Sequence, residues 1–356
     1  MKRTVYSFLF VCCFFLTSCS HVSQSNYSVI DLVNHNQLPI EEIFISDISD
    51  FVHIIPIETN DSILIGRIYE IKIETNKLYI RASNGVFVFD HNGKFLNSVG
   101  SKGRGPKEYL ALYGIYPDDD LIWLLDDSGN KTLKFTDSGK FLASYDWEQP
   151  RLTEFDYYGN DTFVGFLPDY GLPKTNIMLA FFHTTGTVDS VLYRKPIEKN
   201  VRQIIHLYGE ANFINDGNQI KFKHRFNDTI YKINNYKLIP DIVLHLGSGK
   251  ANENARAEAA NKDHYDLSQG MDITTLCGES NRYIYLKVNG IPLFYDKKEQ
   301  KVHKWNFILP DDKRIDPEES KKFVPICIDR NGNLIGQTAS ANEEDNPVII
   351  IAKLKQ

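Results

Sequence analysis

The feature of this chain that most limits its fold is a repeat of about 50 residues. Strand-like apolar segments at 77–80, 86–90 and 92–96 recur in the same order at 121–124, 132–135 and 138–142. The turn glycines Gly93 and Gly139 are 139 − 93 = 46 positions apart. Each follows Asn or Ser, and these pairs predict two-residue hairpins because glycine accepts a positive φ.

Four more copies follow, at 162–192, 220–235, 283–295 and 329–351. Six units of this length are typical of a β-propeller with four-stranded blades. The 356 residues would otherwise suggest two domains. Because blades bury their apolar faces against neighbouring blades, we instead predict an all-β fold, a six-bladed β-propeller of four-stranded antiparallel blades over residues 28–356.

Two segments stand outside the repeat. The last unit lacks an outer strand, and the apolar segment 51–57 is a strand without a unit. We predict that this N-terminal strand completes the sixth blade and closes the ring, which removes two exposed sheet edges. The Ala-rich segment 251–261 predicts a short helix or a mobile excursion between the fourth and fifth blades.

Composition supports a globular chain, with 42% hydrophobic, 12% aromatic and 24% charged residues. These fractions exclude collagen, a coiled coil, intrinsic disorder and a polytopic membrane protein. The formal net charge is 40 − 46 = −6, with no basic block. We therefore expect no nucleic-acid partner.

The N-terminus predicts export and lipidation. Lys2 and Arg3 precede an apolar stretch at 5–16 that is too short to span a bilayer. Leu-Thr-Ser-Cys at 16–19 is typical of a bacterial lipobox. We predict a signal peptide at 1–18, palmitate-type acylation of Cys19 and a polar tether through residue 27. The alternative is an ordinary secretory signal with a chance cysteine.

The expected location of the protein is the outer membrane, on its periplasmic side. Ser at position 20 resembles the signal for outer-membrane sorting, and no acidic cluster follows that would favour surface display. The expected membrane contact is the lipid anchor alone. In the mature chain Cys277 and Cys327 either pair in an oxidising compartment or remain two buried thiols.

Three stretches resemble a known family. They are the Gly-Arg-Gly-Pro-Lys-Glu-Tyr motif at 103–109, the Phe-Asn-Asp-Thr-Ile-Tyr-Lys-Ile run at 226–233 with its continuation to residue 247, and the segment 87–95. With these, the chain resembles six-bladed β-propeller lipoproteins of unknown function from Gram-negative bacteria, distant relatives of NHL-repeat and TolB-like propellers. The resemblance implies the fold and leaves the activity open. Lys107 stands where that family often has Gly.

The 103–109 motif is also the candidate binding site. It lacks the Gly-Lys-Ser/Thr ending of a phosphate loop. We expect a tight connector between the first two blades, with Arg104 paired to a carboxylate. Because such connectors lie on the funnel face, Arg104, Lys107 and Tyr109 are alternatively candidate ligand contacts.

Two function classes remain open from the sequence. The first is a non-catalytic binding or scaffold lipoprotein whose funnel face binds a glycan, a peptide or an envelope protein. The alternative is a metal-dependent lactonase- or lyase-like propeller enzyme with Ca²⁺ in the axial channel. Its ligands would be carboxylates near the starts of inner strands: Asp118, Glu154, Glu210, Glu279 and Asp329. We assign no catalytic residue and no resident metal, because no nucleophile motif or metal-ligand spacing occurs.

Overall fold

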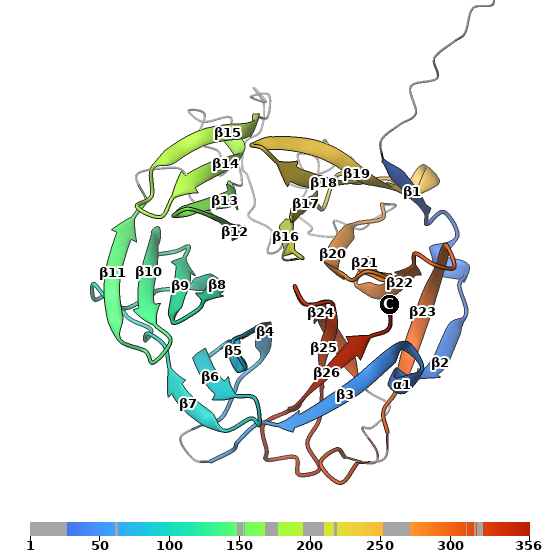
Figure 1. The fold of residues 1–356 in the computed structure, drawn as a ribbon, viewed down its shortest axis with the longest axis horizontal. Coiled ribbons are helices and arrows are strands. Elements are labelled where there is room, and N and C mark those ends of the chain that lie inside the picture. Colours follow the sequence, from blue (N-terminus) through green and yellow to red (C-terminus); the bar gives the residue numbers. More distant parts are fainter. Residues whose placement is uncertain are drawn as a thin grey trace, which may run out of the picture.

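Six innermost strands surround a central axis, and each one begins a blade (Figure 1). The computed structural model describes residues 27–60, 63–147, 152, 154–167, 177–194, 210–216, 219–251, 271–310, 312–316, 318 and 323–356. The predicted signal peptide, Cys19 and all but the last residue of the tether lie outside these residues, as does nearly all of the Ala-rich segment. Within them, no helix is long and apolar enough to cross a membrane.

The six sheets are named blades A to F in chain order of their inner strands. Blade A contains β4 (Ile68–Glu74), β5 (Lys77–Ala82), β6 (Gly85–Asp90) and β7 (Phe95–Ser98). Blade B contains β8 (Leu112–Asp118), β9 (Leu121–Asp126), β10 (Lys131–Thr136) and β11 (Phe141–Asp146). Blade C contains β12 (Glu154–Gly159), β13 (Thr162–Phe166), β14 (Ile177–His183) and β15 (Val188–Arg194).

The second half of the ring continues the same order. Blade D contains β16 (Ala211–Asn215), β17 (Ile220–His224), β18 (Thr229–Asn234) and β19 (Lys237–His245). Blade E contains β20 (Thr274–Glu279), β21 (Tyr283–Val288), β22 (Ile291–Asp296) and β23 (Lys301–Ile308). Blade F contains β24 (Val324–Ile328), β25 (Asn333–Thr338), β26 (Val348–Leu354) and, from the N-terminus, β3 (Ser49–Pro56). The predicted six-bladed propeller is confirmed.

The N-terminal strand β3 closes the ring. It pairs antiparallel with β26 from Pro56 opposite Val348 to Ser49 opposite Leu354. The sequence prediction for the strand at 51–57 is therefore confirmed. The first and last parts of the chain therefore share one sheet, in which β3 covers the edge of β26 and becomes the outer strand of blade F.

Two further N-terminal strands extend blades beyond the predicted four strands. β1 (Ser28–Asp31) pairs in parallel with β19, and β2 (Ile40–Phe44) pairs in parallel with β23. The 3₁₀ turn η1 (His35–Gln37) lies between them, and the single-turn α1 (Ile45–Ile48) joins β2 to β3. Blades D and E thus have five strands. Ile30 of β1 is 1% exposed and packs in the core between these two blades, and this burial stabilises the pairing of β1 with blade D.

The outer hairpins differ from the two-residue turns expected from the sequence. In the first, the Gly93 N–H donates to the Asp90 carbonyl and the Asp90 N–H donates to the Lys94 carbonyl. The loop therefore has three residues, and only Gly93 has positive φ, +84°. This is the three-residue hairpin with a bulged glycine. A Cβ on Gly93 would also lie 2.2 Å from the carbonyl oxygen of Pro56 at the end of β3, so the glycine permits blades F and A to meet.

The hydrophobic core lies between blades rather than at the centre. Tyr79 and Val88 of blade A, for example, pack with Ile122 and Leu124 of blade B, and all four are at most 2% exposed. Equivalent clusters fill the spaces between the other neighbouring blades. The axis is consequently free to hold polar groups.

Candidate ligand-binding site

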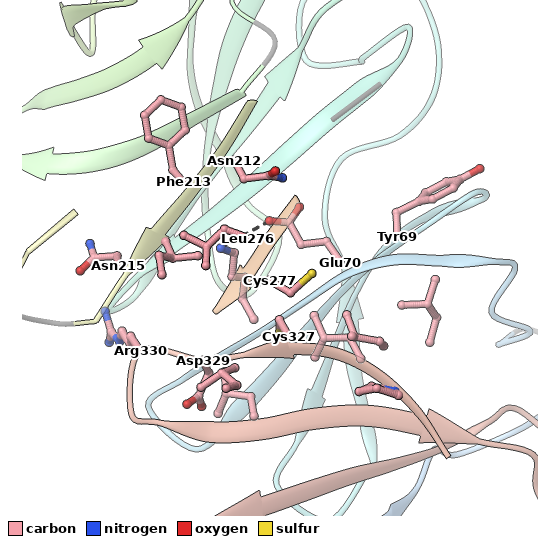
Figure 2. Close-up of a pocket in the computed structure, with 18 of the residues that line it drawn as sticks. Tyr69, Glu70, Asn212, Phe213, Asn215, Leu276, Cys277, Cys327, Asp329 and Arg330 are labelled. Atoms are coloured by element: carbon pink, nitrogen blue, oxygen red, sulfur yellow. Dashed lines mark ion pairs between the residues drawn. The ribbon is translucent and has the colours of Figure 1, made fainter. Parts of the chain in front are cut away.

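A cavity of about 560 Å³ follows the axis of the ring. Its wall includes residues from the inner strands of all six blades. Figure 2 shows Glu70 of β4, Asn212 of β16 and Cys277 of β20 around the middle of this axial cavity, with Asp329 and Arg330 beyond the end of β24. Polar side chains therefore reach the axis from several blades.

The middle of the axial cavity contains a cluster of ionisable groups around Glu70. The Glu70 carboxylate accepts from Nε of Arg81 at 3.0 Å and lies 3.5 Å from Nζ of Lys72. It also accepts from the backbone N–H of Ile115 on β8 at 3.2 Å. Burial opposes the charge on Lys72, but Glu70 and Asp156 overcome this effect and raise the pKa of Lys72. Burial also raises the pKa of Asp156 in spite of the nearby Lys72, so Glu70 is the carboxylate that pairs directly with both cations of the cluster.

Two thiols line the axial cavity on neighbouring inner strands. Cys277 and Cys327 are both free and half-buried. The disulfide considered for them is therefore not formed. Burial raises the pKa of Cys277 to about 11 and that of Cys327 to about 12. Such thiols are almost entirely protonated near neutral pH, which disfavours nucleophilic chemistry.

A second, wider cavity of about 860 Å³ opens where the inner strands of blades A to D begin. We call it the funnel cavity. It shares Glu70, Lys72, Asp156 and the start of β16 with the axial cavity, so the two are continuous. Its volume lies within the range of about 300–1,000 Å³ that is usual for small-molecule sites.

Two cations in the wall of the funnel cavity have no carboxylate partner in the part of the chain that the structure describes. Arg67 precedes β4 and Lys102 lies on the connector between blades A and B; both side chains are exposed. Among the described residues, no carboxylate lies within 4.0 Å of either cationic group. Arg67 and the paired Arg81 both lie near the ring of Tyr69, with Cζ 5.9 and 5.3 Å from its centre. The ring gathers two guanidinium groups at the mouth of the cavity.

The rest of the wall mixes apolar rings with uncharged polar groups. Tyr113, Phe155 and Phe213 are half-buried there. The Oδ1 atom of Asn212 is buried and accepts no hydrogen bond from the described residues. A buried acceptor without a donor is unfavourable, and a ligand donor would relieve this cost.

The connector that carries the sequence motif is tightly braced, as expected. The Gly103 N–H donates to the Tyr109 carbonyl, and the Gly105 N–H donates to the Glu108 carboxylate at 2.8 Å. Beneath it, Asp126 is fully buried and accepts from the backbone N–H groups of Leu110 and Ala111. This carboxylate fixes the end of the connector against blade B.

The predicted site residues separate into two groups on this connector. Tyr109 is 7% exposed, packs in the core between blades A and B, and also lines the funnel cavity. Arg104 and Lys107 are exposed, and neither belongs to the wall of that cavity. Among the described residues Arg104 has no carboxylate partner, contrary to the structural expectation for it. A ligand contact by any of the three residues stays a prediction.

The carboxylates considered as Ca²⁺ ligands do not lie together. Glu154 and Glu210 lie at the starts of β12 and β16, whereas Asp118 and Glu279 end β8 and β20, and Asp329 follows the end of β24. Placing all five near strand starts was therefore wrong for three of them. Within the described part of the chain, no three His, Cys, Asp or Glu side chains form a group that could hold a metal ion.

Sequence reasoning missed the wall of the funnel cavity. Arg67, Arg81 and Lys102 lie in three separate segments that show no shared motif. The available signal was positional, because each lies next to a turn or connector on the face where inner strands begin. This positional signal can be used only when the strand boundaries are known, because without them Arg81 cannot be distinguished from any other cation in a strand.

Comparisons with known proteins agree with this fold. The structure is similar to that of a Bacteroides fragilis protein described as an exported protein, with 16% sequence identity and a TM-score of 0.65. The match covers 92% of this chain and 100% of the other. A DUF4221-family protein of Bacteroides vulgatus has 12% identity and a TM-score of 0.51, over 87% and 98%. At such identities the likeness shows the fold alone. No curated protein matches significantly. One family model matches residues 27–353, and the chain therefore belongs to the family described as a domain of unknown function, DUF4934.

Proposed function

We propose that this propeller is a lipid-anchored envelope protein that binds a ligand in its funnel cavity without chemical conversion. The observation that carries the proposal is the funnel cavity itself, a concave site of about 860 Å³ with apolar rings, a buried acceptor and two cations that have no carboxylate partner among the described residues. These are the ingredients of a recognition site. The exported name of the Bacteroides fragilis relative and the lipobox at Cys19 support an extracytoplasmic place of action.

Binding is favoured over catalysis because the central carboxylate of the cavity is already engaged. Glu70 accepts from Arg81 and from a backbone N–H, and it pairs with Lys72. A general base needs a free lone pair within about 3 Å of the substrate proton. The two free thiols have raised pKa values, which also disfavours an activated nucleophile.

The test is to fill the funnel cavity. Ala111 lines it, so Ala111→Trp places an indole in the space that a ligand would occupy. The matched control is Ala143→Trp on the outer strand β11, where the alanine is also half-buried but lies outside the cavity wall. The purified wild-type protein and both variants are screened against arrays of glycans and of envelope peptides.

We expect the wild-type protein and Ala143→Trp to retain the same bound probes and Ala111→Trp to lose them. The proposal fails if Ala111→Trp binds the same probes with unchanged affinity. It fails equally if the wild-type protein hydrolyses or cleaves a lactone, ester or glycan substrate and Ala111→Trp abolishes that turnover.

A further inference from the structure

The funnel cavity has an uneven charge distribution that restricts its ligand. Its wall carries four cations, Arg67, Lys72, Arg81 and Lys102, and three carboxylates, Glu70, Glu154 and Asp156. In the inner part, Glu70 pairs with Lys72 and Arg81, and the buried Asp156, whose pKa is raised by burial, lies near Lys72. The third carboxylate, Glu154, lies near the buried guanidinium of Arg225.

The cations of the wall that have no carboxylate partner among the described residues are Arg67 and Lys102 at the mouth. They lie in one concave place although the net charge of the whole chain is −6. Low-dielectric walls strengthen the potential inside such a cleft and raise the local concentration of an oppositely charged ligand. The group that matches this part of the wall is an anion.

Arg81 adds directional hydrogen bonding beside that pair. Its Nε donates to Glu70 at 3.0 Å and its Nη1 donates to the Leu112 carbonyl at 3.3 Å. These bonds and the ring of Tyr69 fix the guanidinium plane. Its Nη2 atom makes no hydrogen bond to the described residues. A fixed guanidinium edge suits a carboxylate or sulfate, whose oxygens accept in a defined geometry.

The opposite part of the wall has a different chemistry. It presents half-buried rings, Phe155 and Phe213, and the unpartnered Oδ1 of Asn212. A sugar ring offers both complements, because its C–H groups contact an aromatic face while its hydroxyls donate to an amide oxygen. An acidic peptide would instead spread carboxylates along its length, whereas the cations without a carboxylate partner among the described residues are confined to the mouth.

Resting on the proposed binding function, we propose that the ligand is an acidic saccharide. Its carboxylate or sulfate lies between Arg67, Arg81 and Lys102, and its ring lies against Phe155 and Phe213. The Asn212 amide oxygen accepts a hydroxyl of the same or the next ring.

The test compares charge inside and outside the cavity. Arg67→Ala with Lys102→Ala removes both unpaired cations. Lys94→Ala with Lys140→Ala removes the same charge from two exposed turns of the outer hairpins, outside the cavity wall. Calorimetric titration of the purified protein uses a tetragalacturonate, a glucuronate-containing oligosaccharide, a sulfated galactan oligosaccharide, the carboxyl-reduced neutral form of the first, and tetraglutamate.

We expect at least one acidic saccharide to bind and the Arg67/Lys102 variant to weaken it at least about tenfold, as expected for lost charge-assisted hydrogen bonds. The Lys94/Lys140 variant should stay within about twofold of the wild-type protein. Which acidic probe binds distinguishes a carboxylate ligand from a sulfate ligand.

Three results overturn the inference. Equal binding of the neutral saccharide removes the requirement for an anion, and equal binding of tetraglutamate removes the requirement for a saccharide. Failure of every acidic saccharide to bind removes the ligand class altogether. In each case the Ala111→Trp comparison still decides separately whether the funnel cavity is the binding site.

Discussion

Asn346 joins the two ends of the chain and provides the sharpest test of ring closure. It is 4% exposed and lies just before β26. Its Nδ2 donates to the carbonyls of Glu58 at 2.8 Å and Ile63 at 2.7 Å, and its Oδ1 accepts from the Ile65 N–H at 2.7 Å. These partners lie on the segment that leads from the closing strand β3 to the first strand of blade A.

We expect Asn346→Ala to lower the free energy of unfolding by about 3 kcal/mol or more. A hydrogen bond contributes about 1 kcal/mol net, and three are lost. Two carbonyls and one N–H then lose their partner, and any that water does not reach raises the cost further. The variant should leave the hydrophobic clusters between blades unchanged.

Asn84 is a matched control, because it forms hydrogen bonds to the same segment but is exposed. Its Oδ1 accepts from the Gly66 N–H at 2.8 Å and its Nδ2 donates to the Leu64 carbonyl at 2.7 Å. Because water can replace it, Asn84→Ala should cost less than about 1 kcal/mol. Urea titration followed by tryptophan fluorescence measures both variants, with an unchanged slope confirming comparable transitions. Equal costs for the two variants would refute the reasoning.

Three further predictions test other parts of the molecule. Burial lowers the pKa of Lys223 from 10.5 to about 7, so between these pH values the unfolded chain holds a proton on Lys223 that the folded chain lacks. The free energy of unfolding of the wild-type protein, relative to that of Lys223→Met, should therefore rise by about 1.4 kcal/mol per pH unit from pH 7 to 9. Urea titration measures this difference, and a difference that does not change with pH contradicts the lowered pKa. Deleting residues 50–58 should expose the edge of β26 and cause aggregation on gel filtration, whereas deleting 27–44 leaves the ring closed and the protein monodisperse. Cys19→Ala should move the protein from the detergent phase to the aqueous phase on Triton X-114 partitioning, and retention in the detergent phase would show that the lipobox is not used.

The propeller could be predicted because its information is local and repeated. Each unit carries apolar strands and a turn glycine, so errors in one copy are corrected by the others. The closing strand was found by subtraction, as an apolar segment left over beside a unit with a strand missing. β1 and β2 escaped notice because they are short, carry no hairpin signal and join their blades in parallel, which requires a long connection that sequence patterns do not reveal.

The turn glycines illustrate a limit within the predicted fold. Gly93 was assigned to a turn because glycine accepts positive φ, and it does adopt φ +84°. Its close approach to Pro56 could not be foreseen, because it depends on how blade F meets blade A. The same limit applies to the site: Tyr109 was selected from a conspicuous motif, but it lies mainly in the core between two blades.

The two ends of the axial channel explain why the funnel cavity is the better candidate site. At the far end, Glu74 and Arg330 of the cavity wall pair with each other. Glu279, at the end of β20 and outside that wall, pairs with both Lys221 and Lys297. Such groups already have their partners, and a ligand would have to compete with them. At the funnel end, the paired groups lie deeper and the unpaired cations lie at the mouth. A ligand can bind there without breaking an existing ion pair, so the same sheet architecture gives one end a structural role and leaves the other available for recognition.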